Sequence, residues 1–262
     1  MTRERSTIWC LHGAVGSAAD WNLFRESWEQ AGYDFRAVDL WRFLDCCPRS
    51  LSDTALAFNA EVSAQPGKNL LVAYSMGGRI ALHALLADNA PWHRAVIIAA
   101  HPGLENEEEK IARRQQDAEW SVCCHREAWS EFLERWQAQP ILQMASDQAQ
   151  QGLDRRPLHL RCKEISRSFI SWSLGAQENL WPQLEEIKVP VLWLTGEQDA
   201  KFRSLAERAC SMIPHGSAMV VPAAGHRLPW QQPELFSHKV LTFFAAQDPH
   251  SVSMPQEKTR AD

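Results

Sequence analysis

Short apolar runs alternate with amphipathic stretches along most of the chain. The runs are rich in Val, Ile and Leu and end in turn residues, which is typical of strands buried on both faces of a parallel sheet. They lie at residues 7–13, 34–40, 69–75, 94–100, 189–196 and 217–225. Helical periodicity occupies residues 18–32, 50–65, 76–89 and 200–213. This alternation predicts an α/β fold with a mostly parallel, doubly wound sheet.

The alternation breaks between residues 104 and 185, where a Trp-rich stretch has helical character and no convincing strand. We expect a helical cap inserted over the carboxyl edge of the sheet, where open α/β sheets bind their ligands. The predicted organisation is an α/β core over residues 1–103 and 186–247, the cap over 104–185, and a flexible polar tail over 248–262.

Composition excludes several classes of function. With 45% hydrophobic and 23% charged residues, the 262-residue chain has the make-up of a globular protein with a large core. The formal net charge is −5 and no Lys/Arg block indicates a nucleic-acid surface. The N-terminus lacks a signal-peptide pattern and no apolar run reaches a membrane span, so we expect a cytoplasmic protein. The seven cysteines lack metal-site spacing, and we predict no metal.

A serine followed by glycines stands where the third strand meets its helix. In LLVAYSMGGR, Ser75 precedes Gly77 and Gly78, the context of a turn that presents a nucleophile. The G-x-S-x-G pattern of such elbows asks for glycine at position 73, where this chain has Ala73, so the turn must absorb one methyl group. The alternative is a plain strand-to-helix turn with an incidental serine.

An acid and a histidine follow Ser75 in the order found in α/β hydrolases, each just after a predicted strand. They are Asp199 and His226. The histidine can take a proton from Ser75 while the carboxylate holds its tautomer. Asp199 is also a suitable N-cap for the next helix, and the two roles are compatible. His101 is a rival base, but it comes before any suitable acid.

The loop after the first strand, LHGAVG, matches the segment that supplies one oxyanion-hole amide. The backbone N–H of Ala14 would act there, with that of Met76 as its partner. By itself the loop could be an ordinary Gly-rich turn, but an elbow elsewhere in the chain favours the oxyanion role.

These stretches together resemble the α/β-hydrolase superfamily. Within it they are similar to the menaquinone-pathway synthases of 2-succinyl-6-hydroxy-2,4-cyclohexadiene-1-carboxylate (SHCHC). The elbow indicates the superfamily alone, whereas HPGL with its following basic helix and the W-x-x-Q-P segment are much narrower signals. The matching stretches are 12–21, 74–85, 99–120, 132–142, 173–184 and 196–206.

The resemblance implies a carbon–oxygen lyase. An anionic small molecule with several carboxylates would lose pyruvate after a proton is abstracted next to a carbonyl. Ser75, activated by His226, would act as the base and need form no acyl-enzyme. The resemblance implies neither a metal nor an organic cofactor, and the oligomeric state is not readable from the sequence.

A substrate of this kind needs cationic groups, and bidentate arginine–carboxylate pairs provide both charge and geometry. Arg79 lies four residues after Ser75 and can therefore face the same opening. Arg113 matches an anion-binding arginine in the helix after the family's HPGL stretch. Solvated helix-face arginines are the alternative.

The family has a third arginine in the cap, and it falls near Arg161 in this chain. That alignment requires a gap, so Arg155 and Arg156 stay candidates. Tyr74 and Trp136 match positions that line the family's pocket.

Two other functions stay open from the sequence. A carboxylic-ester hydrolase or thioesterase, including the acyl-carrier methyl-ester esterases, would use the same triad but favour an apolar acyl tunnel. A non-catalytic binding protein with this fold would need no triad, and the intact Ser75–Asp199–His226 set argues against it.

Overall fold

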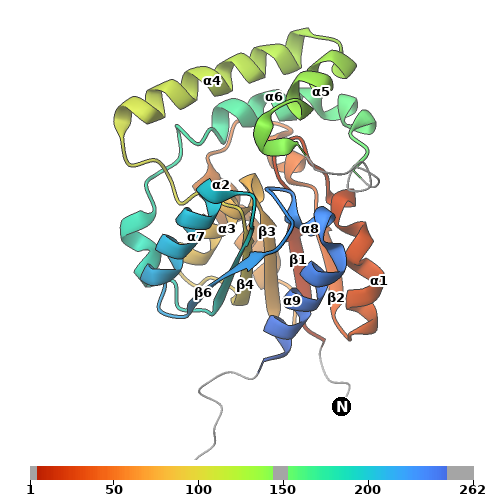
Figure 1. The fold of residues 1–262 in the computed structure, drawn as a ribbon, viewed down its shortest axis with the longest axis vertical. Coiled ribbons are helices and arrows are strands. Elements are labelled where there is room, and N and C mark those ends of the chain that lie inside the picture. The colour runs from red at the N-terminus through yellow and green to blue at the C-terminus, as the bar shows by residue number, and fades with distance from the viewer. Residues whose placement is uncertain (1–4, 144–152, 247–262) are drawn as a thin grey trace, which may run out of the picture.

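The computed structural model describes residues 5–143 and 153–246. Its centre is a six-stranded sheet in the order β2-β1-β3-β4-β5-β6, and every neighbouring pair is parallel (Figure 1). Each of the six apolar runs forms one strand, which confirms the predicted α/β class. The strands are β1 (Thr7–Leu11), β2 (Asp34–Val38), β3 (Asn69–Tyr74), β4 (Trp92–Ile98), β5 (Val191–Gly196) and β6 (Gly216–Val221).

Helices cover both faces of the sheet, as a doubly wound fold requires (Figure 1). On one face lie α1 (Asn22–Gln30) and α9 (Pro233–Ala245). On the other lie α2 (Leu51–Ser63), α3 (Met76–Leu86) and α7 (Ala200–Met212), while the short α8 (Leu228–Gln231) precedes α9. Strand side chains alternate between two cores: Ile8 and Cys10 pack beneath α1 and α9, whereas Trp9 and Leu11 pack on the opposite side.

The chain between β4 and β5 forms a layer over the carboxyl ends of the strands (Figure 1). It contains α4 (Glu107–Arg126), α5 (Trp129–Gln137) and α6 (Cys162–Ser171). Aromatic rings join the three helices, with Trp136 lying 5.1 Å from Trp120 and 5.3 Å from Phe169 between ring centroids. Trp120 and Trp136 therefore help to hold these three helices together. The polar tail predicted for residues 248–262 lies outside the described residues.

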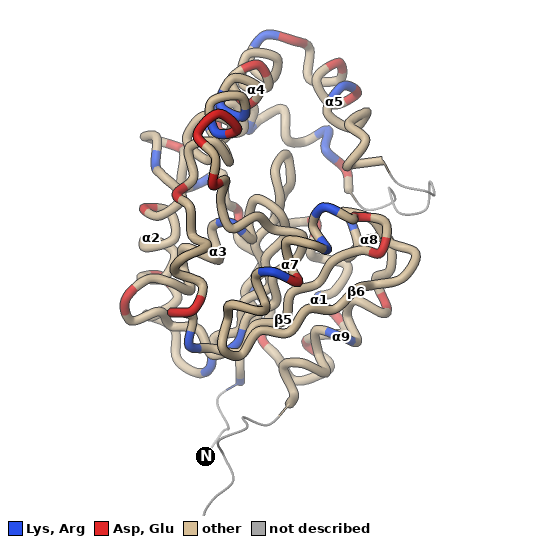
Figure 2. Tube along the Cα trace, turned by 60° about the vertical axis from the view of Figure 1, so that its left-hand side comes forward, with Lys and Arg blue, Asp and Glu red and all other residues tan. Residues whose placement is uncertain are grey.

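Charged residues are distributed unevenly over this architecture (Figure 2). Strands β5 and β6 carry none, whereas α4 carries both signs along its length. Within residues 5–143 and 153–246, no helix combines the length and apolarity that a membrane crossing requires.

Candidate active site

The turn that carries Ser75 joins β3 directly to α3, and its backbone is strained. Ser75 has φ 51° and ψ −109°, a combination that residues other than glycine rarely adopt. Its N–H donates to the carbonyl of Ile98 at 2.8 Å, which holds the turn against β4. The sharp turn presents the Ser75 side chain at the carboxyl edge of the sheet, beneath the cap.

The two glycines after Ser75 are required by close approach. A Cβ on Gly77 would lie 2.5 Å from the carbonyl oxygen of His12, and one on Gly78 would lie 2.6 Å from the Cβ of Ala100. Ala73 occupies a different environment, because it is fully buried within β3 and packs in the core on the α3 side. The core accommodates its methyl group, so the absent glycine does not disturb the turn.

Ser75, His226 and Asp199 lie in one hydrogen-bonded line. The His226 Nε2 is 3.1 Å from Ser75 Oγ, and the Nδ1 is 2.7 Å from Asp199 Oδ2. An ionised carboxylate can only accept, so His226 carries its proton on Nδ1 and leaves Nε2 free to accept from the serine. Asp199 also accepts from the Phe202 N–H and caps α7, so both predicted roles fit the geometry.

A cavity of about 240 Å³ opens beside Ser75. The two residues predicted to supply oxyanion amides, Ala14 and Met76, lie on its wall. Met76 is the first residue of α3, so its N–H has no acceptor within the helix. The remaining walls mix polar and apolar groups, including Arg79, His101, Arg113, Gln116, Asp117, Trp120, Trp136, Gln139, Leu174, Phe202 and His226.

Arg79 is a buried cation on the wall of the cavity that Ser75 also lines. Its residue is 8% exposed, and its Nη1 donates to the neutral Oε1 of Gln177 at 3.3 Å. Burial, reinforced by the positive charge of Arg113, lowers the pKa of Arg79 to about 9, which still leaves it protonated at neutral pH. A buried cation held by a neutral amide is incompletely compensated, and an anionic ligand would supply the missing charge.

Arg113 reaches the same cavity from α4. Its Nε lies 2.9 Å from both carboxylate oxygens of Asp117, one helical turn away. Its Nη groups have no hydrogen bond to the described residues, so they can donate to a ligand. Among the described residues, the cavity wall therefore carries two guanidinium groups and one carboxylate, an excess of positive charge around Ser75.

The third predicted arginine is not at this cavity. Arg161 donates from Nη2 to Asp39 and from Nη1 to Asp45, each at 2.9 Å, and it does not line this cavity, so the described structure gives no support to its predicted contact with substrate. Arg156 pairs with Asp154 at the surface, its side chain 87% exposed. Arg155 turns inward instead and pairs with Asp20 near the first loop.

Tyr74 lies behind the triad and does not line the cavity. Its ring packs against His226 at 5.5 Å and Trp230 at 4.9 Å between centroids. The ring also fills the space where a Cβ on Gly13 would stand, and burial raises the pKa of the phenol. Tyr74 therefore packs against the core in this structure, and the cavity lining gives no support to its predicted contact with substrate, whereas Trp136 does reach the cavity wall.

His101 lines the cavity, and its tautomer and protonation state could not be read from the sequence. Its Nδ1 accepts from the Gly103 N–H at 3.0 Å, so a neutral ring carries its proton on Nε2. Burial, with smaller contributions from Lys201 and Arg79, lowers the pKa of His101 to about 4. At neutral pH this ring is an uncharged hydrogen-bond donor, which argues against His101 as the base.

Gln177 is a further residue of the site. It lies in the matching stretch 173–184, but nothing in that stretch singled it out. Its Oε1 accepts from Arg79, and its Nε2 donates to the carbonyl of His101 at 3.1 Å. One amide thus fixes two cavity residues that lie 98 and 76 positions away from it. Within the described residues, no group of three or more His, Cys, Asp or Glu side chains is arranged to hold a metal ion.

His83, one turn after Arg79, should make the fold sensitive to acid. Its buried Nε2 has no hydrogen-bond partner among the described residues, and burial together with Arg79 lowers its pKa from 6.5 to about 4. The unfolded chain binds this proton first, so stability falls as the pH drops through that window. Between pH 7 and 5 we expect His83 to contribute a loss of about 2 kcal/mol in the free energy of unfolding.

Urea unfolding of the wild type and of His83→Leu at both pH values measures this contribution, because the other titrating groups cancel in the difference. His125→Leu, at an exposed position of α4, is the matched control. Equal pH sensitivity in the wild type and His83→Leu would contradict the assignment.

Sequence comparison agrees with the geometry. The model of the alpha/beta hydrolase family matches residues 10–239, a span that includes Ser75, Asp199 and His226. The chain belongs to the alpha/beta hydrolase family. This family member is 28% identical over 232 residues to the 2-succinyl-6-hydroxy-2,4-cyclohexadiene-1-carboxylate synthase of Salmonella paratyphi C, covering 85% of this chain and 87% of the relative.

Solved structures share the fold of this alpha/beta hydrolase. MenH from S. aureus superposes with a TM-score of 0.81 at 22% identity, covering 93% of this chain and 95% of that chain. A malate-bound esterase from Thermogutta terrifontis has a TM-score of 0.72 at 19% identity, covering 92% and 89%. MenH and the esterase thus share the fold of this chain, and the fold alone does not assign a reaction.

Proposed function

We propose that this alpha/beta hydrolase is a lyase that eliminates pyruvate from a polycarboxylate precursor of menaquinone, as an SHCHC synthase does. The observation that carries the proposal is the pair of guanidinium groups, Arg79 and Arg113, on the wall of the cavity that holds Ser75 and His226. They come from separate elements, one from the core and one from the cap. The similarity to the Salmonella synthase supports the same reaction.

In the proposed reaction the serine oxygen takes a proton from carbon. His226 accepts the hydroxyl proton of Ser75, and Ser75 Oγ removes the hydrogen next to a substrate carbonyl. The N–H groups of Ala14 and Met76 stabilise the negative charge that develops on the carbonyl oxygen. The electron pair of the broken C–H bond then forms a C=C bond as the bond from a ring carbon to the ether oxygen breaks, and enolpyruvate leaves. The proton held by His226 converts the enolpyruvate to pyruvate, which returns His226 to its neutral form.

Anion binding is the proposed task of the other polar groups. Arg79 and Arg113 would each pair with a substrate carboxylate. The neutral Nε2–H of His101 would donate a further hydrogen bond without adding charge. Trp120 and Trp136 would cover the apolar ring of the substrate.

Ester hydrolysis is the second candidate, favoured by the triad geometry and by the fold shared with esterases. An esterase acting on neutral acyl groups gains nothing from a buried Arg79, because that cation stays uncompensated when such a substrate binds. The excess positive charge around Ser75 therefore favours the lyase.

A paired assay separates the two candidates. Purified protein is supplied with the unstable pathway precursor, and in parallel with p-nitrophenyl acetate and butyrate. We expect pyruvate to form well above the buffer control and ester hydrolysis to be slow. Brisk ester hydrolysis with pyruvate formation at the buffer rate would overturn the proposal and favour the esterase.

A further inference from the structure

The loop after β1 is wound tightly by its own hydrogen bonds. The Gly16 N–H donates to the Gly13 carbonyl at 3.1 Å, and Val15 has φ 49°. Asp20 closes the far end: one carboxylate oxygen accepts from the Ser17 N–H and the other from the Ser17 hydroxyl, each at 3.1 Å. Asp20 therefore anchors the loop that contains Ala14.

The direction of the Ala14 N–H is set by the carbonyl before it. The His12 Nε2 accepts from the Leu40 N–H at 3.1 Å, so its Nδ1 is protonated and donates to the Gly13 carbonyl at 2.9 Å. A planar trans peptide places C=O and N–H on opposite sides. With the Gly13 oxygen held by His12 and Gly16, the N–H of Ala14 must point the other way.

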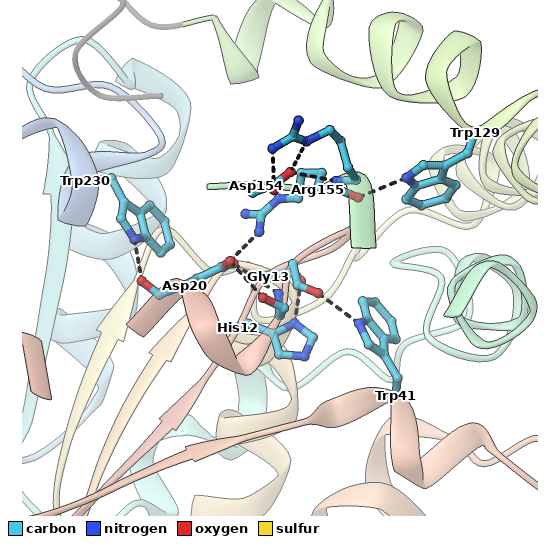
Figure 3. A network of polar contacts seen from close by, with 11 residues as sticks. His12, Gly13, Asp20, Trp41, Trp129, Asp154, Arg155 and Trp230 are labelled. Atoms are coloured by element: carbon cyan, nitrogen blue, oxygen red, sulfur yellow. Dashed lines mark hydrogen bonds and ion pairs between the residues drawn. The ribbon is translucent and has the colours of Figure 1, made fainter. Parts of the chain in front are cut away.

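Four side chains of the described structure hold the backbone of this loop and Asp20 in place (Figure 3). Three belong to the core: His12, Trp41, which donates to the Gly16 carbonyl at 2.8 Å, and Trp230, which donates to the Asp20 carbonyl at 3.0 Å. The fourth is Arg155, whose Nη1 pairs with Asp20 Oδ1. Arg155 comes from the segment between β4 and β5, so it connects the cap to the loop.

This connection is buried and rigidly supported. The side chains of Arg155 and Asp20 are 10% and 3% exposed, so water screens their attraction weakly. The carbonyl of Arg155 accepts from the Trp129 Nε1 of α5 at 2.9 Å. Arg156, the next residue, lies at the surface and makes no contact with this loop in the described structure.

We propose that Arg155 is a positioning residue, which holds the oxyanion loop through Asp20 so that the Ala14 N–H stays aimed at the reacting oxygen. The proposal rests on the proposed role of Ser75 and deepens it, because it makes the cap part of the transition-state machinery. Removing an oxyanion donor lowers kcat by about 10²- to 10³-fold. A misaimed donor should therefore lower kcat by about tenfold to a hundredfold, with KM within about twofold of the wild type.

The test compares Arg155→Met with Arg156→Met as the matched control and Arg155→Lys as the conservative variant. Arg227 of the core also lies near Asp20, so Arg155→Met does not leave that carboxylate without a cation. We expect a fall in kcat for Arg155→Met, partial recovery for Arg155→Lys and wild-type values for Arg156→Met. A raised KM with unchanged kcat would overturn the proposal, because it would mean that Arg155 holds the substrate itself.

Hydrogen exchange provides a readout that does not depend on the reaction. Amides of residues 13–20 should exchange faster in Arg155→Met than in Arg156→Met, while peptides from β3 and β4 stay unchanged. This measurement can be made even if no pyruvate is formed. Failure of the proposed function can therefore be distinguished from failure of Arg155 to hold the loop. If the amides of residues 13–20 exchange at the wild-type rate in folded Arg155→Met, the proposal that Arg155 holds this loop is overturned.

Asp20→Asn tests whether Arg155 acts through Asp20, because this substitution removes the charge of the side chain while keeping one oxygen that can accept from Ser17. If Arg155 acts through Asp20, the double variant Asp20→Asn with Arg155→Met should have the kcat of the more impaired single variant. Multiplicative effects on kcat would overturn the coupling.

Discussion

Ser75→Ala is expected to lower the rate of pyruvate release by about 10³- to 10⁴-fold, because it removes the proposed base while leaving the oxyanion amides and arginines in place. Alanine is close in size to serine, and the melting temperature should stay near that of the wild type. The measurement is pyruvate formation by a coupled lactate dehydrogenase assay, with thermal unfolding as the check on folding.

Ser121→Ala is the matched control, since Ser121 bonds to Ser166 within the cap at 2.9 Å and lines no part of the cavity. Its turnover should equal that of the wild type. Turnover within tenfold of the wild type in folded Ser75→Ala would remove Ser75 from the chemistry.

Arg79→Met should produce the second large effect. Loss of a charge-assisted contact of about 1.5–3 kcal/mol corresponds to roughly a 10- to 150-fold fall in kcat/KM for the polycarboxylate. The variant should be no less stable than the wild type, because it also removes an incompletely compensated buried cation. Lower activity without lower stability is the pattern expected of a group that serves the ligand and not the fold.

Arg79→Lys should retain part of the activity, since lysine keeps the charge but loses the planar fork. Arg161→Met should stay within about threefold of the wild type, because Arg161 pairs with Asp39 and Asp45 outside the cavity. Equal losses in Arg79→Met and Arg161→Met would contradict the assignment of the anion site to Arg79.

The fold and the triad could be predicted because their signals are local. Each apolar run forms its own strand, and parallel strands bring their carboxyl ends to one edge wherever they lie in the sequence. Ser75 directly follows β3, and Asp199 and His226 lie in the short loops that follow β5 and β6. The order of the strands is therefore sufficient to bring the three residues together. The register of the sheet did not have to be known.

The cap was harder to predict because its side chains depend on how helices pack. Arg155, Arg156 and Arg161 lie within seven residues, yet they pair with acids in three different places, at Asp20, at Asp154, and at Asp39 with Asp45. No periodicity in the sequence predicts which of these arginines turns toward the core and which stays at the surface. That choice is made by tertiary contacts.

Long-range polar contacts were also invisible in the sequence. His101 was a rival base by position, but the N–H of Gly103 fixes its tautomer and makes it a donor. Gln177 lies in a stretch that matches the family, but its position between Arg79 and His101 comes from the fold and could not be seen in the sequence. Tyr74 was expected at the cavity, but its neighbour Trp230 and the close approach of Gly13 hold it behind the triad.

A single-turnover experiment tests the central claim most directly. The protein is mixed in excess with the polycarboxylate precursor and quenched at intervals, and pyruvate and the intact mass of the protein are measured in each sample. Proton abstraction by Ser75 predicts one equivalent of pyruvate per substrate while the protein mass stays unmodified at every time. A mass increase on the peptide that contains Ser75, or pyruvate formation no faster than in buffer, would contradict it.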